Sequence, residues 1–223
     1  MGKNQRKSAT GTVTTFGRGA VRATPDLMRI TVSIESRAEQ VALAYGQAGA
    51  RVGAVTEALR GHGIPGSDIA TGGLSVRTET IWTEGQGNRI TGYLATTDLT
   101  VVLREIGPDA DPGPAAVIAD CVEAGGDDVR LGGLALSVAD QAGLLAQARD
   151  AAWDDALAKA AQYAVRASRV LGPVIEITEN TASPVPVAPR LMAVSAPAGG
   201  APVPIEAGET EISANVRATW QLD

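Results

Sequence analysis

Two long segments of alternating sequence, joined by a short turn, constrain the fold of this chain more than any other feature. Residues 68–83 and 89–104 each alternate between two faces, which is the pattern of a β-strand with one face turned towards a core. The linking residues, EGQGN, supply the glycines that hairpin turns favour. The positions that share a face are Leu74, Val76, Thr78, Thr80 and Trp82 in the first segment, and Tyr93, Ala95, Thr97, Leu99, Val101 and Leu103 in the second. We therefore predict a long antiparallel hairpin over residues 68–104.

The remaining patterns predict five more strands and three helices. The strands are expected at 12–23, 27–36, 128–138, 171–180 and 211–222, and the helices at 38–61, about 113–124 and about 139–168. Because only the short ATPD connection separates the first two strands, we expect them to form a hairpin. The resulting order is β-β-α-β-β-α-β-α-β-β. It predicts an α+β fold, with a mostly antiparallel sheet and helices packed on one face.

By composition, the chain divides into a short arm, one domain and a proline-rich excursion within that domain. Residues 1–10 hold three basic and no acidic side chains, which predicts a flexible basic arm. Residues 11–223 are expected to form a single domain, since this length suffices to bury a core. Between the last two strands, at about 181–204, proline, alanine and glycine dominate. A loop of this length is either a surface excursion or an arm that docks on a neighbouring subunit.

The charge balance excludes a nucleic-acid-binding role. The chain has 19 basic and 25 acidic side chains, a formal net charge of −6, and only 3% aromatic residues. Nucleic-acid binding requires a basic stripe and, for single strands, aromatic side chains on which bases stack. We accordingly expect no nucleic-acid partner.

The sequence also bears on location in the cell. It contains no run of about 20 apolar residues, so we expect no transmembrane helix. Behind the basic start at residues 1–11 there is no apolar segment of the kind found in secretory signals. The sequence as written therefore predicts a cytoplasmic protein, whereas a chain trimmed of its signal would be periplasmic or otherwise extracytoplasmic.

Neither the single cysteine nor the single histidine predicts a catalytic residue. Cys121 lies on the apolar face of the second predicted helix, where a small buried thiol is the expected state. His62 follows the first helix in RGHGIPGSD, where we expect it to cap helix carbonyls or to face solvent. One histidine and one cysteine cannot form a Cys/His zinc site, and no nucleophile elbow accompanies them. We predict no catalytic, cofactor-binding or metal-binding residue, and no cofactor.

Acidic residues that could suggest a cation site have simpler interpretations. Asp127–Asp128 lies at a helix-to-strand turn, where aspartate is a common residue. Asp154–Asp155 lies on a helix, where neighbouring side chains diverge. Glu79 and Glu84, near the long hairpin, are expected to be solvated charges.

Two glycines and a tryptophan attract attention for other reasons. Gly17 and Gly19 lack the third glycine and the following helix of a dinucleotide-binding loop. They are typical instead of a bulge or of a close backbone approach. Trp82, near a strand end, is either an exposed interface anchor or a core residue.

Taken in order, several segments of the chain resemble the SIMPL-domain family, also called the DUF541 group. No single segment is specific, but their order and spacing from about residue 13 to residue 222 carry the resemblance. The segments are VTTFGRGAVRATPD (13–26), GIPGSDIAT (63–71), ITGYLATTDLTV (90–101), ARDAAWDDALAKAAQYA (148–164), LGPVIEITE (171–179) and VPIEAGETEISANVRATWQL (203–222), together with Ala44, Leu59 and Ala124-Gly125. The resemblance implies an α+β fold and large homo-oligomers, ring-like or channel-like in some members. It also implies bacterial export and an association with stress tolerance and the cell envelope, and it implies no catalytic residue.

Three functional hypotheses follow. The one we favour is a non-enzymatic protein whose partner is itself, with subunit contacts made by the hairpin 68–104 and by the proline-rich arm. The alternative is a monomeric or small-oligomer binding module for a small molecule or peptide, whose ligand the sequence does not specify. The third is an enzyme that acts through carboxylates and arginines alone, and the lack of a convergent polar motif weighs against it.

Overall fold

The computed structural model describes residues 11–85, 87–104, 106–107, 109–179 and 205–223. They group into two compact units. Unit 1 holds the described residues of Met1–Thr24, Asp140–Leu191 and Glu209–Asp223, and unit 2 holds those of Pro25–Ala139 and Met192–Gly208. The basic arm at 1–10 and the excursion at 181–204 lie outside the described residues. That residues 11–223 behave as a single domain stays a prediction, for which the Discussion gives a test.

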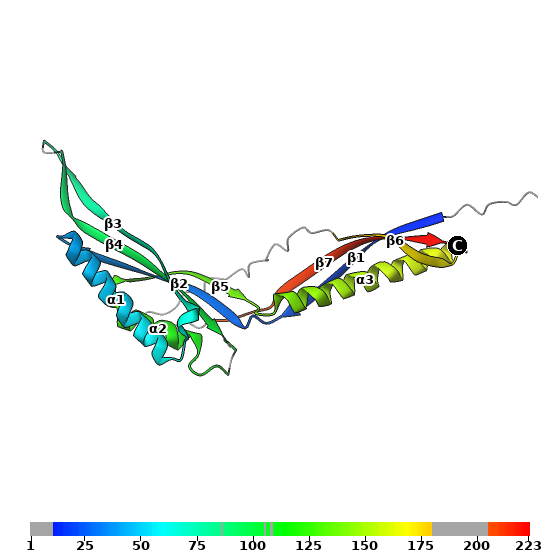
Figure 1. Cartoon of the computed structure of the whole chain (residues 1–223), viewed down its shortest axis with the longest axis horizontal. Helices are drawn as coiled ribbons and strands as arrows, with labels where there is room; N and C mark the ends of the chain where they lie inside the picture. The colour runs from blue at the N-terminus through cyan, green and yellow to red at the C-terminus, as the bar shows by residue number, and fades with distance from the viewer. Residues whose placement is uncertain (1–10, 86, 105, 108, 180–204) are drawn as a thin grey trace, which may run out of the picture. The chain divides into compact units, whose positions relative to one another are not determined.

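The order of strands and helices is the predicted one, and every strand pairing is antiparallel (Figure 1). The α+β fold class is therefore confirmed. The strands are β1 (Gly11–Ala23), β2 (Leu27–Ala38), β3 (Ile69–Thr83), β4 (Gly87–Arg104), β5 (Val129–Ser137), β6 (Leu171–Glu179) and β7 (Thr210–Leu222). The helices are α1 (Val41–Gly61), α2 (Pro114–Gly125) and α3 (Gln141–Arg166). Two short 3-10 helices, Gly66–Asp68 and Gly126–Asp128, precede β3 and β5.

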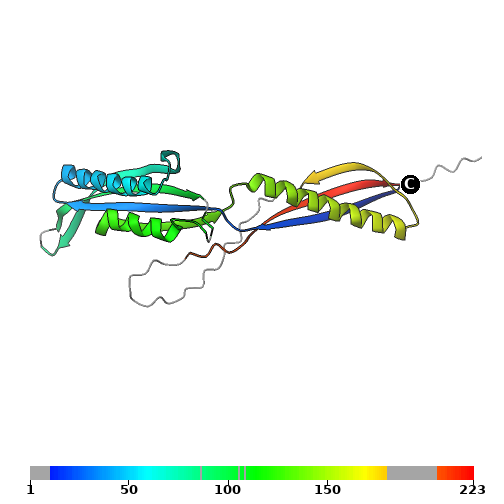
Figure 2. The ribbon, with the colours of Figure 1, turned by 90° about the horizontal axis from the view of Figure 1, so that it is seen from below.

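Unit 1 is a three-stranded sheet in the order β1-β7-β6, with α3 along one face (Figure 2). Every fourth residue of the central part of α3 is a buried alanine, so that one narrow stripe of the helix meets the sheet. The stripe consists of Ala148, Ala152, Ala156, Ala160 and Ala164. Trp220 of β7 and Trp153 of α3 stack beside this stripe, with ring centroids 5.8 Å apart and planes tilted by 45°.

The alanine stripe brings the backbone of α3 very close to β1. A Cβ atom on Gly17 would lie 1.9 Å from the carbonyl oxygen of Ala152, and one on Gly19 would lie 2.0 Å from that of Ala148. Nearer the C-terminal end of α3, Thr15 donates a 2.8 Å hydrogen bond from Oγ1 to the carbonyl oxygen of Ala156. Of the two alternatives expected for these glycines, a bulge or a close backbone approach, the close approach is the one found.

Unit 2 is a four-stranded sheet in the order β3-β4-β2-β5, with α1 and α2 on one face (Figure 2). The alternating pattern of β2 turns its aliphatic residues towards these helices and leaves a polar face on the other side. The predicted inward face of β4 is buried from Ala95 to Leu103. The core consists of Met28, Ile30, Val32, Ile34, Ala44, Ala48, Val55, Leu59, Ala95, Leu99, Val101, Leu103, Ile106, Val117 and Cys121.

The predicted hairpin between the first two strands is wrong. β1 pairs with β7 over thirteen residue pairs, from Gly11–Leu222 to Ala23–Thr210, whereas β2 pairs with β4 and β5. The connection explains the difference, because Pro25 favours an extended conformation for the residue before it. The chain therefore passes from one sheet to the other instead of turning back.

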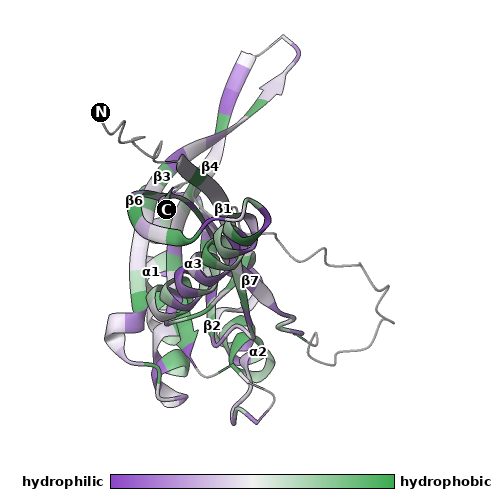
Figure 3. Cartoon of the chain, turned by 90° about the vertical axis from the view of Figure 1, so that its right-hand side faces the viewer, coloured by the Kyte–Doolittle hydropathy of each residue, from purple (hydrophilic) through white to green (hydrophobic). Residues whose placement is uncertain are grey.

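The long hairpin predicted over 68–104 is confirmed as β3 and β4, which pair from Ile69–Val101 to Thr83–Gly87. Register shifts occur between Gly72 and Ser75 and between Glu79 and Thr80. Beyond α1 the hairpin continues as a free two-stranded ribbon that carries both hydrophilic and hydrophobic residues (Figures 1 and 3). The side chains of β3 are exposed over most of its length, because α1 lies mainly over β2 and β4.

Candidate functional site

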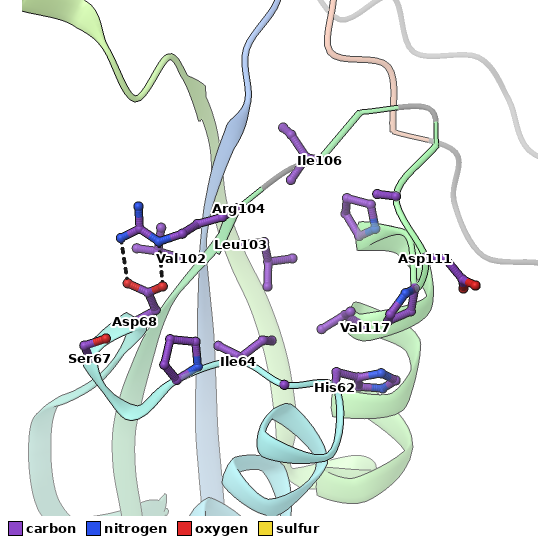
Figure 4. A pocket seen from close by; sticks show the side chains of 15 residues that line it. His62, Ile64, Ser67, Asp68, Val102, Leu103, Arg104, Ile106, Asp111 and Val117 are labelled. Atoms are coloured by element: carbon purple, nitrogen blue, oxygen red, sulfur yellow. Dashed lines mark hydrogen bonds and ion pairs between the residues drawn. The ribbon is translucent and has the colours of Figure 1, made fainter.

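A cavity of about 460 Å³ lies in unit 2 beside the last residues of β4 (Figure 4). Ile64, Leu103 and Val117 line it with apolar side chains, and they come from the α1–β3 connection, β4 and α2. Three prolines, Pro65, Pro112 and Pro114, add further apolar surface. A volume of this size falls in the range of small-molecule sites.

The polar side of the cavity contains an ion pair between Asp68 and Arg104 (Figure 4). The guanidinium donates from Nε to Oδ2 at 2.7 Å and from Nη2 to Oδ1 at 2.9 Å, the two-pronged geometry that strengthens such pairs. The Asp68 side chain is only 7% exposed, while that of Arg104 is 58% exposed. The hydrogen bonds from Arg104 hold the pKa of the Asp68 carboxyl below its ordinary value, although burial opposes the change. The same hydrogen bonds raise the pKa of Arg104.

This ion pair predicts a pH dependence of stability. A carboxyl whose pKa is lower in the folded than in the unfolded chain stabilises the fold above its unfolded pKa of about 3.9, and this contribution disappears as the pH falls through the folded value. We expect Asp68→Asn to lower the free energy of unfolding at pH 7, and the difference from the wild type to shrink as the pH falls below about 4. Urea unfolding at a series of pH values measures both effects.

Asp154→Asn provides the control for that series. It removes the same charge from a carboxylate that makes no ion pair with any other described residue. Its pH profile should follow that of the wild type. A constant offset between Asp68→Asn and the wild type from pH 7 to pH 3 would contradict the assignment of the effect to the Asp68 carboxylate.

His62 lies at the edge of the cavity, immediately after α1. Its backbone N–H completes the helix by donating to the carbonyl oxygens of Ala58 and Leu59. His62 thus caps the helix carbonyls through its backbone, which is one of the two positions expected from the sequence. Its side chain takes no part in this cap. Instead, Nε2 lies 2.6 Å from Oδ2 of Asp120 on α2, because the end of α1 lies beside that helix.

Cys121 is buried in the core of unit 2, as the sequence predicts. Burial, with a smaller contribution from the neighbouring Asp120 carboxylate, raises the pKa of the thiol to about 11. The thiolate is the nucleophilic form, so this environment makes the sulfur unreactive at neutral pH.

Thiol labelling tests this description of Cys121. At pH 8 we expect a disulfide reagent such as DTNB to leave the folded chain unmodified. In guanidinium chloride it should modify the single cysteine of the chain completely. Rapid stoichiometric labelling of the folded chain at pH 8 would contradict the burial of the thiol.

One aspartate of each acidic pair singled out from the sequence is held by neighbours of its own. Asp128 accepts hydrogen bonds from Ser36 Oγ at 2.9 Å and from Arg51 Nε at 3.3 Å. Asp155 accepts from Lys159 Nζ at 2.6 Å and from the backbone N–H of Arg18 at 2.8 Å. These contacts, the lysine first, lower the pKa of Asp155. Among the described residues, no group of three or more histidine, cysteine, aspartate or glutamate side chains is placed to hold a metal ion.

The residues near the hairpin differ in part from expectation. Glu79, expected to be solvated, forms an ion pair with Arg37 of β2 at 3.0 Å, because the strand register brings the two side chains to the same face. Glu84 is exposed, as expected. Trp82 is 67% exposed, which excludes the core position. The Asp68–Arg104 pair was not predicted, because no sequence signal links two charges 36 residues apart.

Comparisons with known proteins agree with this fold. The family described as SIMPL, protein of unknown function (DUF541), matches residues 13–220. The 26 kDa periplasmic immunogenic protein of Brucella melitensis biotype 1 is 29% identical over 230 residues, which cover 99% of this chain and 88% of that protein. The protein of the same name from Brucella abortus strain S19 matches with the same identity and coverage.

The described part of the chain contains no helix with the length and apolar character needed to cross a membrane.

The family match extends from the first strand to the last. The resemblance of the segments at 13–222 is thereby confirmed, and the chain belongs to the SIMPL family.

Proposed function

We propose that this protein is non-enzymatic and assembles with copies of itself into a large homo-oligomer of ring-like or channel-like form. The observation that carries the proposal is the set of large apolar side chains that the β3–β4 hairpin leaves exposed to water. The set consists of Leu74, Val76, Ile81, Trp82 and Ile90. Contiguous exposed apolar residues mark interaction sites in soluble proteins.

The strand register places several of these side chains together. Ile90 lies opposite Thr80, so that it shares a face of the ribbon with Trp82, two residues further along β3. A second copy that covers this face would remove a tryptophan and an isoleucine from water. Each fully buried large apolar side chain contributes roughly 1.5–3 kcal/mol, enough to favour association.

The proposal extends to a role in the bacterial cell envelope, linked to stress tolerance. This part rests on the family resemblance and on the relatives, whose names describe them as periplasmic proteins. It predicts that the protein is found in the periplasmic fraction of its host, where fractionation with an antibody would locate it. Recovery with cytoplasmic markers only would contradict it.

Size-exclusion chromatography with light scattering tests the assembly proposal directly. We expect a mass several times the 22.7 kDa of one chain at micromolar concentration. Electron microscopy of that fraction should then show closed particles. A mass of one chain across the concentration range would overturn the proposal.

We expect Trp82→Ser to weaken the assembly. The concentration at which the mass falls to half its limiting value should rise at least tenfold. A tryptophan at the centre of an interface commonly contributes 2 kcal/mol or more to binding. Tyr163→Ser, which removes an exposed aromatic residue of α3, is the matched control and should leave the mass unchanged. An unchanged mass for Trp82→Ser would exclude the hairpin as the contact.

The cavity supports a second candidate, a binding module for a small molecule. The hydrogen bonds to Asp68 use Nε and Nη2 of Arg104. The Nη1 donors of this half-exposed guanidinium remain available to a ligand beside the apolar walls of the cavity. Such a site suits an apolar molecule with one acidic group. In a thermal-shift screen of carboxylic acids, a true ligand would stabilise the wild type but not a Val117→Trp variant, in which the indole fills the cavity. Equal shifts in both proteins would contradict this candidate.

A further inference from the structure

The two edges of the sheet in unit 1 differ in whether side chains of the same chain bond to the backbone of the edge strand. At the β1 edge, the backbone N–H of Arg18 donates to Asp155 at 2.8 Å, and the carbonyl oxygen of Phe16 accepts from Lys159 at 2.9 Å. Side chains of α3 thus take the positions that an added strand would need. At the other edge, β7 is the only described partner of the backbone of β6 from Val174 to Glu179. The sheet can therefore grow at β6 but not at the middle of β1.

The open edge also carries uncovered apolar residues. Val174 and Ile177 lie opposite Trp220 and Ala218, on the face that α3 covers. However, α3 lies over β1 and β7 and barely reaches β6. The side chains of Val174 and Ile177 are consequently 40% and 56% exposed.

An edge of the sheet in unit 2 has the same character. β5 is the outer strand beside β2, and its Leu131 and Leu134 lie opposite Val32 and Ile30 of the core. They share the face covered by α1 and α2, yet they are 53% and 46% exposed. Both sheets thus end in an edge strand with two exposed aliphatic side chains on the helix-covered face. At β5 one backbone acceptor is already used, because Nη1 of Arg130 donates to the carbonyl oxygen of Val129 at 2.8 Å.

The spacing of these residues matches in detail. In β6 a register shift at Ile175 places Val174 and Ile177, which are three residues apart, on the same face. In β5 a shift at Gly133 does the same for Leu131 and Leu134. Laid antiparallel, the two strands place Val174 opposite Leu134 and Ile177 opposite Leu131. Pro173 has no N–H to donate, so the paired stretch begins at Val174.

Charge on the opposite face agrees with this register. Glu176 lies opposite Thr219 and Arg130 lies opposite Ser33, so each points away from the helices of its own sheet. In the antiparallel arrangement Arg130 is opposite Thr178 and diagonal to Glu176, a distance that long side chains span. No described residue forms an ion pair with Glu176, whereas Arg130 lies 3.8 Å from Glu35 and remains half exposed.

From these observations we propose that β6 of one copy pairs antiparallel with β5 of a second copy, so that Val174–Glu179 and Val129–Leu134 join two sheets into one. This inference rests on the proposed self-assembly and adds a second contact to that of the β3–β4 hairpin. The contact joins two different edges, so it leaves β5 of the first copy and β6 of the second open for further copies. Such a head-to-tail contact closes into a ring when the rotation between copies divides a full turn.

Disulfide trapping tests the register. Directly opposite residues of an antiparallel pair bring their Cβ atoms within about 5.5 Å, close to what a disulfide needs. We expect the double variant Ile177→Cys/Leu131→Cys to form, under mild oxidation, a ladder of covalent multimers on non-reducing gels. Each single variant should stay monomeric on the same gels, and Cys121, which is buried, can remain in place in all of them.

Every other outcome of the trapping experiment overturns the proposal. A covalent dimer from Ile177→Cys alone would mean that two β6 strands meet each other. Loss of both thiols without a change in mass would mean that the cysteines join within one chain. No disulfide in the double variant, while the wild type retains its large mass in light scattering, would refute this interface and leave self-assembly standing. A monomeric wild type would refute both.

Charge reversal gives an independent reading that does not depend on trapping. Glu176→Arg places two arginines side by side in the joined sheet, and we expect it to weaken association at least tenfold by light scattering. The double variant Glu176→Arg/Arg130→Glu restores opposite charges and should recover most of the loss, with circular dichroism used to verify that each variant is folded. Failure of the second substitution to restore the mass would contradict the pairing of these two side chains.

Discussion

The substitution Gly17→Ala should destabilise the protein by about 3 kcal/mol or more, because the added methyl group has no space. It would lie 1.9 Å from the carbonyl oxygen of Ala152 and 2.8 Å from the Cβ of Ala156. The obstruction is helix backbone, which a side-chain rotation cannot relieve, so α3 must move away from β1. Urea unfolding followed by circular dichroism measures the loss.

Gly49→Ala serves as the matched control for that substitution. Gly49 lies on the exposed face of α1, and a methyl group there meets nothing within 4 Å. Alanine favours a helix over glycine by about 1 kcal/mol, so this variant should be more stable than the wild type. If Gly17→Ala were as stable as the wild type, the close approach of α3 to β1 would be wrong.

Leu99→Ala should cost roughly 2–5 kcal/mol, the usual range for a fully buried leucine. Leu99 lies on β4, one of the two inner strands of its sheet, and faces the core beneath the helices. Its removal leaves a cavity that neighbouring strands, held by hydrogen bonds on both sides, cannot close. Leu43→Ala, at an exposed position of α1, should change stability by no more than about 0.5 kcal/mol.

Together, the two destabilising variants test the single-domain organisation. Gly17 belongs to unit 1 and Leu99 to unit 2. In one cooperative domain, both substitutions shift the same unfolding transition to a lower urea concentration. The size of each shift is set by the free energy of unfolding that the substitution removes. Two transitions, of which each variant shifts only one, would show that the units unfold separately and would contradict the single domain.

The sequence was sufficient to locate the strands and helices, but it could not assign strand partners. Alternation in 27–36 identifies a buried face for that strand, yet it carries no information on which strand lies alongside. The pairing of β1 with β7 depends on how well α3 fits the glycine-containing face of β1, which is a property of three distant segments together. Proximity in sequence therefore suggested a hairpin that the fold does not contain.

The sequence could likewise predict only part of the candidate site. Cys121 could be predicted as buried because helical periodicity reports directly on burial. The Asp68–Arg104 pair could not, because its geometry arises where a 3-10 helix meets the end of β4. Likewise, apolar alternation in β3 predicts a face that avoids water, but it cannot distinguish a core of the same chain from a surface that another copy covers.

The pairing of the first strand with the last sets an order of events during synthesis. Most of unit 2 is one continuous stretch, Pro25–Ala139, so all four strands of its sheet are present once the chain has been translated to Ser137. Unit 1 requires β7, which ends at Leu222, before β1 has a neighbour in its sheet. Contacts this distant in sequence form slowly, because a long loop must close before they are made. Each nascent chain therefore carries β1 without its sheet partner from the synthesis of Ala23 until that of Thr210, and this strand is where we would expect chaperones to bind.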